Sequence, residues 1–247
     1  MNVHGGAAVS LAGRCAVVTG ASRGIGRATA VALAAGGARV VAIARDRDAL
    51  QRLVAELATT PGGAVALACD LTREEQVEGA LAELAGTIGV PDLLVNNAGI
   101  FALGAIGALP PREVERMVQL NLLAPYRLMH ALVPGMRMRG SGHVITIGSV
   151  ADRTTFPENA GYAAGKFGAR AMHEVLRQEL RGSGVRVSLV SPGPTDTAIW
   201  DPIDPDSRPG FTPRARMLRA DAVADAVLWL ATRPADVNID ELRLSHS

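Results

Sequence analysis

This chain has few aromatic residues, few cysteines and almost no net charge, and each shortage excludes a class of protein. Its two cysteines, Cys15 and Cys69, cannot build a disulfide framework, so we expect reduced, buried thiols and a cytoplasmic location. The formal net charge is +1 and no block of Lys and Arg occurs, which argues against a nucleic-acid partner. No apolar run is long enough to cross a bilayer, so no membrane partner is expected.

The histidines offer no metal site. His130, His143 and His173 have spacings that suit no ligand set. We expect all three to be ordinary surface or core residues, and no metal is predicted.

Strand-like and helix-like segments alternate through the whole chain. Short apolar runs predict strands at residues 15–18, 39–44, 64–69, 92–95, 144–147, 185–190 and 239–244. Helices are expected at 25–35, 46–58, 111–139 and 220–231, with another carrying Tyr162 and Lys166. This order predicts an α/β fold, with one parallel sheet of about seven strands and helices on both faces. A capping box formed by Thr72 and Glu75 is expected to begin the helix after the third strand.

The length of 247 residues suits a single domain. Residues 1–12 are expected to be a flexible lead-in, and residues 13–247 the domain. Residues 194–213 contain five prolines and are expected to form a substrate lid, although a merely disordered loop fits almost as well. Trp200 and Phe211 in this segment are candidates for substrate contact, but not for the chemistry.

A glycine-rich turn follows the first expected strand. Gly20, Gly24 and Gly26 would let the backbone approach a pyrophosphate, and the helix that begins there offers free amide groups. The spacing departs from G-x-G-x-x-G, and any tight turn from strand to helix favours glycine. This motif alone therefore leaves a phosphate site and a purely structural turn both open.

The end of the second strand is expected to select the cofactor. A carboxylate at this position favours NAD, whereas arginine favours the 2′-phosphate of NADP. The strand ends with Ala44 and Arg45, and Arg23 in the glycine turn can reach the same region. Two arginines predict NADP(H), with NAD(H) less favoured; Asp46 is the nearby carboxylate that fits NAD instead.

Tyr162 and Lys166 stand four residues apart on one expected helix, so both side chains face the same way. A free phenol has a pKa of about 10, and a nearby ammonium group or an oxidised nicotinamide is expected to lower it. Tyr162 could then exchange a proton with a carbonyl or alcohol oxygen. Ser149, thirteen residues earlier, follows the fifth strand and could donate a hydrogen bond to the same oxygen.

Taken in order, these motifs resemble the short-chain dehydrogenase/reductase family over residues 14 to 200. The turn at residues 19–26 is similar to its Thr-Gly-x-x-x-Gly-x-Gly cofactor loop, and residues 96–99 to its Asn-Asn-Ala-Gly signature. Asn121 matches the asparagine that holds a water in the proton relay, and it completes a catalytic tetrad with Ser149, Tyr162 and Lys166. Pro192, Gly193 and Thr197 match the segment beside the nicotinamide. The cofactor contacts that the resemblance implies are Gly20, Ser22, Arg23, Gly24, Ile25, Gly26, Arg45, Asp70, Leu71, Asn97, Ala98, Gly99, Tyr162, Lys166, Pro192, Gly193, Thr195 and Thr197.

The resemblance implies a Rossmann-like fold, a homotetramer or homodimer, and NADP(H)-dependent interconversion of a small ketone or aldehyde and its alcohol. Residues 237–242 lack the glycine-rich ending of 3-oxoacyl-carrier-protein reductases and resemble the branch that acts on 3-hydroxy acids. Reduction of 3-oxoacyl thioesters remains an alternative, and a non-catalytic NADP-binding sensor or scaffold is a rival of another class. Gly161, Gly165 and Gly168 fit either an interface between subunits or close packing within one subunit.

Overall fold

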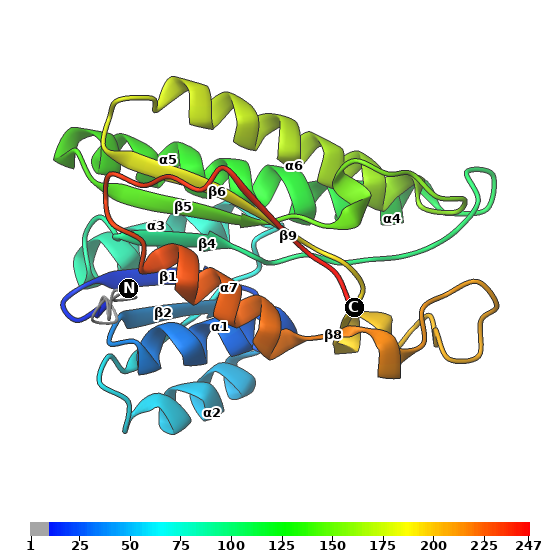
Figure 1. The fold of residues 1–247 in the computed structure, drawn as a ribbon, viewed down its shortest axis with the longest axis horizontal. Helices are drawn as coiled ribbons and strands as arrows, with labels where there is room; N and C mark the ends of the chain where they lie inside the picture. The colour runs from blue at the N-terminus through cyan, green and yellow to red at the C-terminus, as the bar shows by residue number, and fades with distance from the viewer. Residues whose placement is uncertain (1–9) are drawn as a thin grey trace, which may run out of the picture.

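The computed structural model describes residues 10–247, which form one parallel seven-stranded sheet covered by helices on both faces (Figure 1). The strand order is β3-β2-β1-β4-β5-β6-β9, and every neighbouring pair is parallel. This confirms the predicted fold. The strands are β1 Cys15–Thr19, β2 Arg39–Ala44, β3 Ala64–Ala68, β4 Leu93–Asn96, β5 Gly142–Ile147, β6 Val185–Pro192 and β9 Glu241–Leu244.

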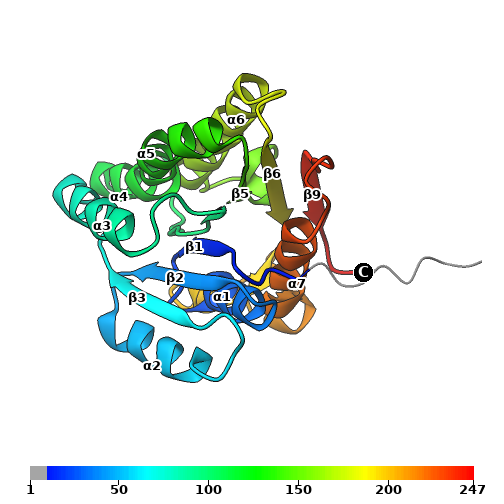
Figure 2. The ribbon, with the colours of Figure 1, turned by 90° about the vertical axis from the view of Figure 1, so that its left-hand side faces the viewer.

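Two layers of helices bury the two faces of the sheet (Figure 2). One layer contains α1 Gly24–Ala35, α2 Arg47–Leu57 and α7 Ala220–Ala231; the other contains α3 Glu74–Thr87, α4 Pro111–Val118, α5 Ala124–Arg139 and α6 Ala160–Glu179. Neighbouring strand residues point to opposite faces, so Val17 and Val18 of β1 belong to different apolar clusters. Both faces of the strand must therefore be apolar, which explains its uninterrupted hydrophobic sequence.

The helix expected over residues 111–139 contains an irregular turn. A π-helical segment, Gln119–Leu123, separates α4 from α5 and carries the buried Asn121. Such wide turns occur frequently at functional sites.

Close packing within the subunit accounts for the three glycines of α6. A Cβ at Gly161 would lie 2.5 Å from Met117 Cε, and one at Gly168 would lie 2.9 Å from Leu122 Cδ2. At Gly165 the nearest atom would be Asn121 Cβ, at 3.0 Å. These glycines let α6 approach the α4 and π-helical segments, and therefore bring Tyr162 and Lys166 near Asn121.

Two local expectations need correction. The capping box at residues 72–75 is wrong, because the Thr72 hydroxyl donates to Asp70 Oδ1 at 2.7 Å and α3 begins at Glu74 without a side-chain cap. Residues 1–9 of the expected lead-in lie outside the described residues. Leu11 is fully buried and its N–H donates to Gly36 O at 2.8 Å, so the packed domain begins before Gly13.

Residues 194–213 and the residues directly after them form short elements. These are β7 Thr195–Asp196, paired with β8 Leu218–Arg219, and the 3₁₀ turns η3 Ala198–Trp200 and η4 Arg214–Arg216. Arg214 follows the segment directly, and its guanidinium donates to Asp196 at 2.7 Å and to Asp201 at 2.6 Å. These contacts favour a folded segment over a disordered loop, and its role as a lid stays a prediction.

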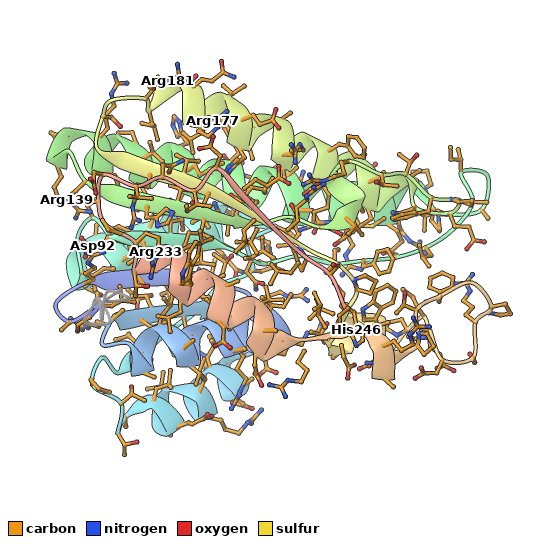
Figure 3. The ribbon with its side chains drawn as sticks, in the orientation of Figure 1. Asp92, Arg139, Arg177, Arg181, Arg233 and His246 are labelled. Carbon is orange, nitrogen blue, oxygen red and sulfur yellow. The ribbon has the colours of Figure 1, made fainter. Side chains whose placement is uncertain are left out.

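Several ion pairs and arginines lie at the end of the sheet that is opposite the lid. Figure 3 shows Asp92, Arg139 and Arg233 at that end, with His246 near the lid. The Arg139 guanidinium lies 3.3 Å from the Asp92 carboxylate.

Across residues 10–247, no helix combines the length and the apolar character that a membrane crossing needs.

Candidate active site

A cavity of about 590 Å³ opens at the carboxyl edge of the sheet, and residues between Pro192 and Thr212 form one part of its lining. Open α/β sheets bind ligands at this edge, because the loops that leave the strands converge there. The cavity brings together residues that are far apart in the sequence, from Arg23 to Thr212. The predicted site residues that line it are Arg23, Gly24, Ile25, Asn97, Gly99, Ser149, Tyr162, Lys166, Pro192, Gly193, Thr195 and Thr197.

Tyr162, Lys166 and Ser149 meet at the floor of this cavity. Lys166 Nζ donates to Ile147 O at 2.8 Å and lies 5.7 Å from the centroid of the Tyr162 ring. Ile147 ends β5, and Ser149 follows two residues later, so this hydrogen bond fixes α6 against the strand that supplies the serine. The sequence expectation that these three residues share one site agrees with this geometry.

The acidity of Tyr162 differs from the expectation. Burial raises the pKa of Tyr162 to about 12, while the Ser149 hydroxyl lowers it and the Asp152 charge raises it further. Burial also lowers the pKa of Lys166 to about 8, against the opposing charge of Asp152. The predicted lowering of the phenol pKa is therefore wrong for the protein alone, because desolvation of the phenolate outweighs the hydrogen bond from Ser149. At neutral pH Tyr162 is protonated, which is the state that donates a proton.

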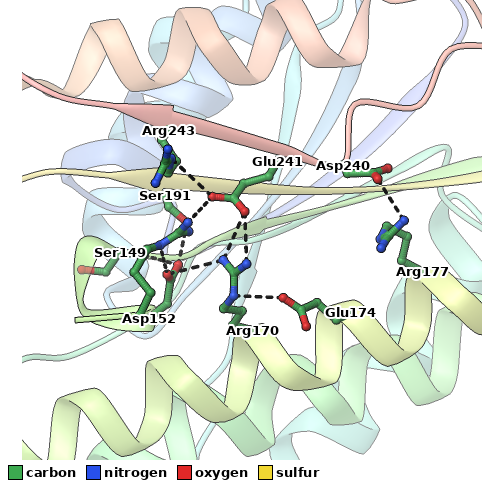
Figure 4. A network of polar contacts seen from close by, with 10 residues as sticks. Ser149, Asp152, Arg170, Glu174, Arg177, Ser191, Asp240, Glu241 and Arg243 are labelled. Carbon is green, nitrogen blue, oxygen red and sulfur yellow. Dashed lines mark hydrogen bonds and ion pairs between the residues drawn. The ribbon is translucent and has the colours of Figure 1, made fainter. Parts of the chain in front are cut away.

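Sequence reasoning missed Asp152, which holds the Ser149 turn in place (Figure 4). Its carboxylate is fully buried and accepts from Ser149 N–H at 3.2 Å, while Ser149 Oγ accepts from Ala151 N–H at 3.1 Å. Together these bonds form a capping box around a short 3₁₀ turn, Val150–Asp152. The spacing Ser-x-x-Asp is the signal in the sequence that could have indicated it.

Two arginines neutralise Asp152 and connect it to the end of the chain (Figure 4). Arg153 Nε donates to Asp152 Oδ1 at 2.8 Å, and Arg170 lies 3.7 Å from the same oxygen. Both arginines also pair with Glu241 in β9, and the Ser191 hydroxyl of β6 donates to Asp152. Burial alone would raise the pKa of Glu241, but the two arginines hold it below its usual value. The serine turn, α6 and the last strand are thus held by one charged network.

The glycine turn leaves open a space that the Cβ atoms of other residues would occupy. Gly20 and Gly24 have φ angles of 67° and 55°, in the left-handed region that favours glycine. α1 begins here, and no side chain caps the amide groups of its first turn. This arrangement fits the pyrophosphate of a dinucleotide, which would bind to the free end of α1.

We expect Gly26→Ala to weaken cofactor binding and to lower stability. A Cβ at Gly26 would lie 2.3 Å from Gly20 O and 2.4 Å from Asn97 Nδ2, so the turn must shift. Overpacking of this kind costs about 1–3 kcal/mol, and the NADPH affinity should fall at least about tenfold. Urea unfolding and NADPH titration measure the two effects. Gly86→Ala in α3, where no atom lies within 4 Å of the new Cβ, is the matched control. It should leave the NADPH affinity unchanged and should not lower stability, because alanine is more favourable than glycine within a helix.

The Asn-Asn-Ala-Gly segment joins the ends of β1 and β4. Asn97 Nδ2 donates to Thr19 O at 2.8 Å, and the Asn97 and Ala98 N–H groups donate to Thr19 Oγ1 at 2.9 and 3.0 Å. Asn121 holds the next residue, since its Nδ2 donates to Ile100 O at 3.0 Å and its Oδ1 accepts from Ile100 N–H at 2.9 Å. Both ends of the Asn121 amide are thus engaged, and its role in holding a water stays a prediction.

The expected adenosine end of the site lies outside the cavity. Asp46 caps α2 by accepting from Ala49 N–H at 2.9 Å, which engages one of its two carboxylate oxygens. Arg23 and Arg45 are both exposed. Burial raises the pKa of Asp70, but hydrogen bonds from Thr72 and the charge of Arg45 outweigh it and leave the pKa low. The predicted site residues that do not line the cavity are Gly20, Ser22, Gly26, Arg45, Asp70, Leu71, Ala98 and Asn121.

The buried histidines and cysteines lie outside the cavity lining. His143 Nε2 lies 2.8 Å from Ser188 Oγ in the core, and burial lowers the pKa of both His143 and His173. Burial raises the pKa of Cys69 to about 11 and also raises that of Cys15, so neither thiol is activated. His143 and His173 are core residues, as expected.

Comparison with known proteins gives consistent matches over nearly the whole chain. A family model described as short chain dehydrogenase matches residues 14–208. The 3-oxoacyl-acyl-carrier-protein reductase FabG of Escherichia coli is 34% identical over 226 residues, which cover 90% of this chain and 91% of that protein. The glycine betaine reductase ATRR of Emericella nidulans is 36% identical over 235 residues; the match covers 94% of this chain but only 18% of that protein.

Solved structures agree with these matches. The crystal structure of a metagenomic short-chain oxidoreductase in complex with NADP is 34% identical and superposes with a TM-score of 0.82. The match covers 96% of this chain and 98% of that one.

Proposed function

Because the chain belongs to the short-chain dehydrogenase/reductase family, we propose that it uses NADP(H) to interconvert a small ketone or aldehyde and its alcohol. The observation that carries this proposal is the position of Ser149, Tyr162 and Lys166 in the cavity that the cofactor loop also lines. A protein that only binds a dinucleotide has no need of a buried phenol beside a buried ammonium. The sensor or scaffold alternative therefore has less support.

Each residue of the chain has a distinct task in this proposal. Bound NADPH supplies the hydride. Tyr162, protonated at neutral pH, donates its phenolic proton to the carbonyl oxygen. The Ser149 hydroxyl donates a hydrogen bond to the same oxygen as negative charge develops on it. Lys166, held by Ile147 O, keeps a positive charge beside the phenol.

The preference for NADP(H) rests on residues at the cofactor's adenosine end. Arg23 and Arg45 are exposed and free to meet a 2′-phosphate, whereas Asp46 is engaged in capping α2. The metagenomic oxidoreductase of similar structure was crystallised with NADP, which supports the same choice. A homodimer or homotetramer remains part of the proposal.

A panel of ketones, aldehydes and alcohols tests this function, with NADPH and NADH compared in parallel. We expect carbonyl-dependent oxidation of NADPH, and a kcat/KM for NADPH at least about tenfold above that for NADH. Tight NADPH binding without turnover of any member of the panel would favour the sensor.

Reduction of 3-oxoacyl thioesters is the second candidate, because the Escherichia coli reductase FabG is similar over 90% of the chain. The ending at residues 237–242 lacks the glycine-rich sequence of such reductases, which weakens this candidate. Activity on an acyl-carrier-protein substrate far above activity on free ketones would establish it.

A further inference from the structure

The scarce aromatic residues of this chain are concentrated at one place. The sequence contains four Phe, two Trp and two Tyr, and five of these eight residues line the cavity. Three of them, Phe101, Trp200 and Phe211, come from two loops that are far apart in the sequence. A chain with so few aromatic residues would not collect them at one wall by chance packing alone.

These rings form a continuous wall that begins at Tyr162. The Phe101 ring lies 4.7 Å from the Tyr162 ring and 5.2 Å from the Trp200 ring, in both cases edge to face. Phe211 extends the wall, with its centroid 6.4 Å from Trp200. The Trp200 indole N–H donates to Thr195 O at 3.0 Å, so its polar end is already satisfied. The wall therefore offers apolar ring surface next to the proton donor.

Among residues 10–247, the lining of the cavity on this side includes no cation that lacks a partner. Its charged lining residues are Arg23, Glu158 and Lys166. Lys166 is directed to Ile147 O beneath the Tyr162 ring, and Arg23 belongs to the cofactor turn. Glu158 lies on the rim, where Arg208 of the lid pairs with it at 2.9 Å. The Arg208 guanidinium also lies 5.2 Å from the centroid of the Phe211 ring, but Glu158 already pairs with it. A substrate carboxylate that entered here would lose its hydration and would have to compete with Glu158 for that guanidinium.

We propose that the wall formed by Phe101, Trp200 and Phe211 selects neutral carbonyl compounds that bear an apolar ring, and that it rejects hydroxy or oxo acids. This inference rests on the proposed function, since it names the substrate class of the same site. It reverses the expectation from residues 237–242, which favours 3-hydroxy acids. The ring of the substrate packs on Phe101 and Trp200, which places its carbonyl group beside Tyr162 and Ser149.

Three matched ketones test the selection: acetophenone, 4-acetylbenzoate and methyl 4-acetylbenzoate. The ester matches the acid in size but carries no charge. We expect kcat/KM for the ester to be within about fivefold of that for acetophenone. The kcat/KM for the acid should be at least about 100-fold lower, because its carboxylate loses its hydration next to an arginine that Glu158 already neutralises.

Substitution of Trp200 tests the wall itself. Trp200→Ala should lower kcat/KM for acetophenone by about 10- to 30-fold, from the loss of ring contact, and should change that for acetone by less than about threefold. Trp200→Phe keeps an aromatic ring at this position, so it should retain most of the parent's kcat/KM for acetophenone. Trp229→Ala is the matched control, because Trp229 lies on α7, outside the cavity, and is 43% exposed. This variant should leave kcat/KM unchanged for both acetophenone and acetone.

The outcomes separate this inference from the function on which it rests. If 4-acetylbenzoate is reduced as fast as its ester, the aromatic wall does not select against charge and the inference fails, while the proposed function stands. Equal losses for acetophenone and acetone in Trp200→Ala would also overturn it. If no ketone supports NADPH oxidation, the proposed function itself fails.

Discussion

Tyr162→Phe is expected to lower kcat for carbonyl reduction by roughly 10²- to 10⁴-fold, which is the usual contribution of a positioned proton donor. The substitution removes one hydroxyl from a ring that lines the cavity, and the ring keeps its contact with Phe101. The affinity for NADPH should therefore remain within a few fold of the parent value. Steady-state kinetics and an NADPH titration of the same preparation separate the two effects.

The second tyrosine supplies the control for this experiment. Tyr126 lies on α5, is 52% exposed and stacks on His130. Tyr126→Phe also removes one phenolic hydroxyl, but at a site away from the cavity, and this variant should retain full activity. A Tyr162→Phe variant that turns over as fast as the parent would refute the role of Tyr162 as the proton donor.

Asp152→Ala is expected to damage both stability and turnover. Removal of one partner from a buried ionic group costs about 3–5 kcal/mol, and here Arg153 and Arg170 lose a fully buried carboxylate. The Ser149 N–H also loses its acceptor, so kcat should fall by roughly 10- to 100-fold. Urea unfolding and steady-state kinetics measure the two effects.

Asp152→Asn distinguishes two effects of Asp152: the hydrogen bond that positions Ser149, and the negative charge that pairs with the arginines. An amide oxygen can still accept from Ser149 N–H, so this variant should recover much of the lost kcat while it remains less stable than the parent. Glu174→Ala is the control, because Glu174 pairs with Arg170 at the exposed edge of the network and does not contact the serine turn. It should cost no more than about 1 kcal/mol. Full stability and full kcat in Asp152→Ala would contradict the positioning of Ser149 by Asp152.

The elements with strong local signals could be predicted from the sequence with correct bounds. Arg39–Ala44 and Ala220–Ala231 agree residue for residue with β2 and α7, because each has an apolar pattern that ends at a clear boundary. The wide turn at Gln119–Leu123 could not be predicted, since a π-helical turn has nearly the same hydrophobic pattern as the α-helix around it.

The site was predictable in its composition but not in its energetics. Ordered motifs identify Ser149, Tyr162 and Lys166, yet the sequence does not give the depth of burial that raises the pKa of Tyr162 to about 12. Local patterns also compete: Ser149 and Asp152 form a capping box, whereas Thr72 is taken by Asp70 and does not. Two partners of Asp152, Arg170 and Ser191, come from distant parts of the chain, and only the folded chain brings them together.

Hydride transfer from NADPH to a carbonyl carbon is tested most directly with NADPH that carries deuterium at both C4 positions of the nicotinamide. Reduction of acetophenone should give an alcohol with one deuterium on its carbinol carbon, detected by mass spectrometry and NMR. An alcohol without the label, or NADPH oxidation without alcohol, would contradict the assignment of this cavity as the site of carbonyl reduction.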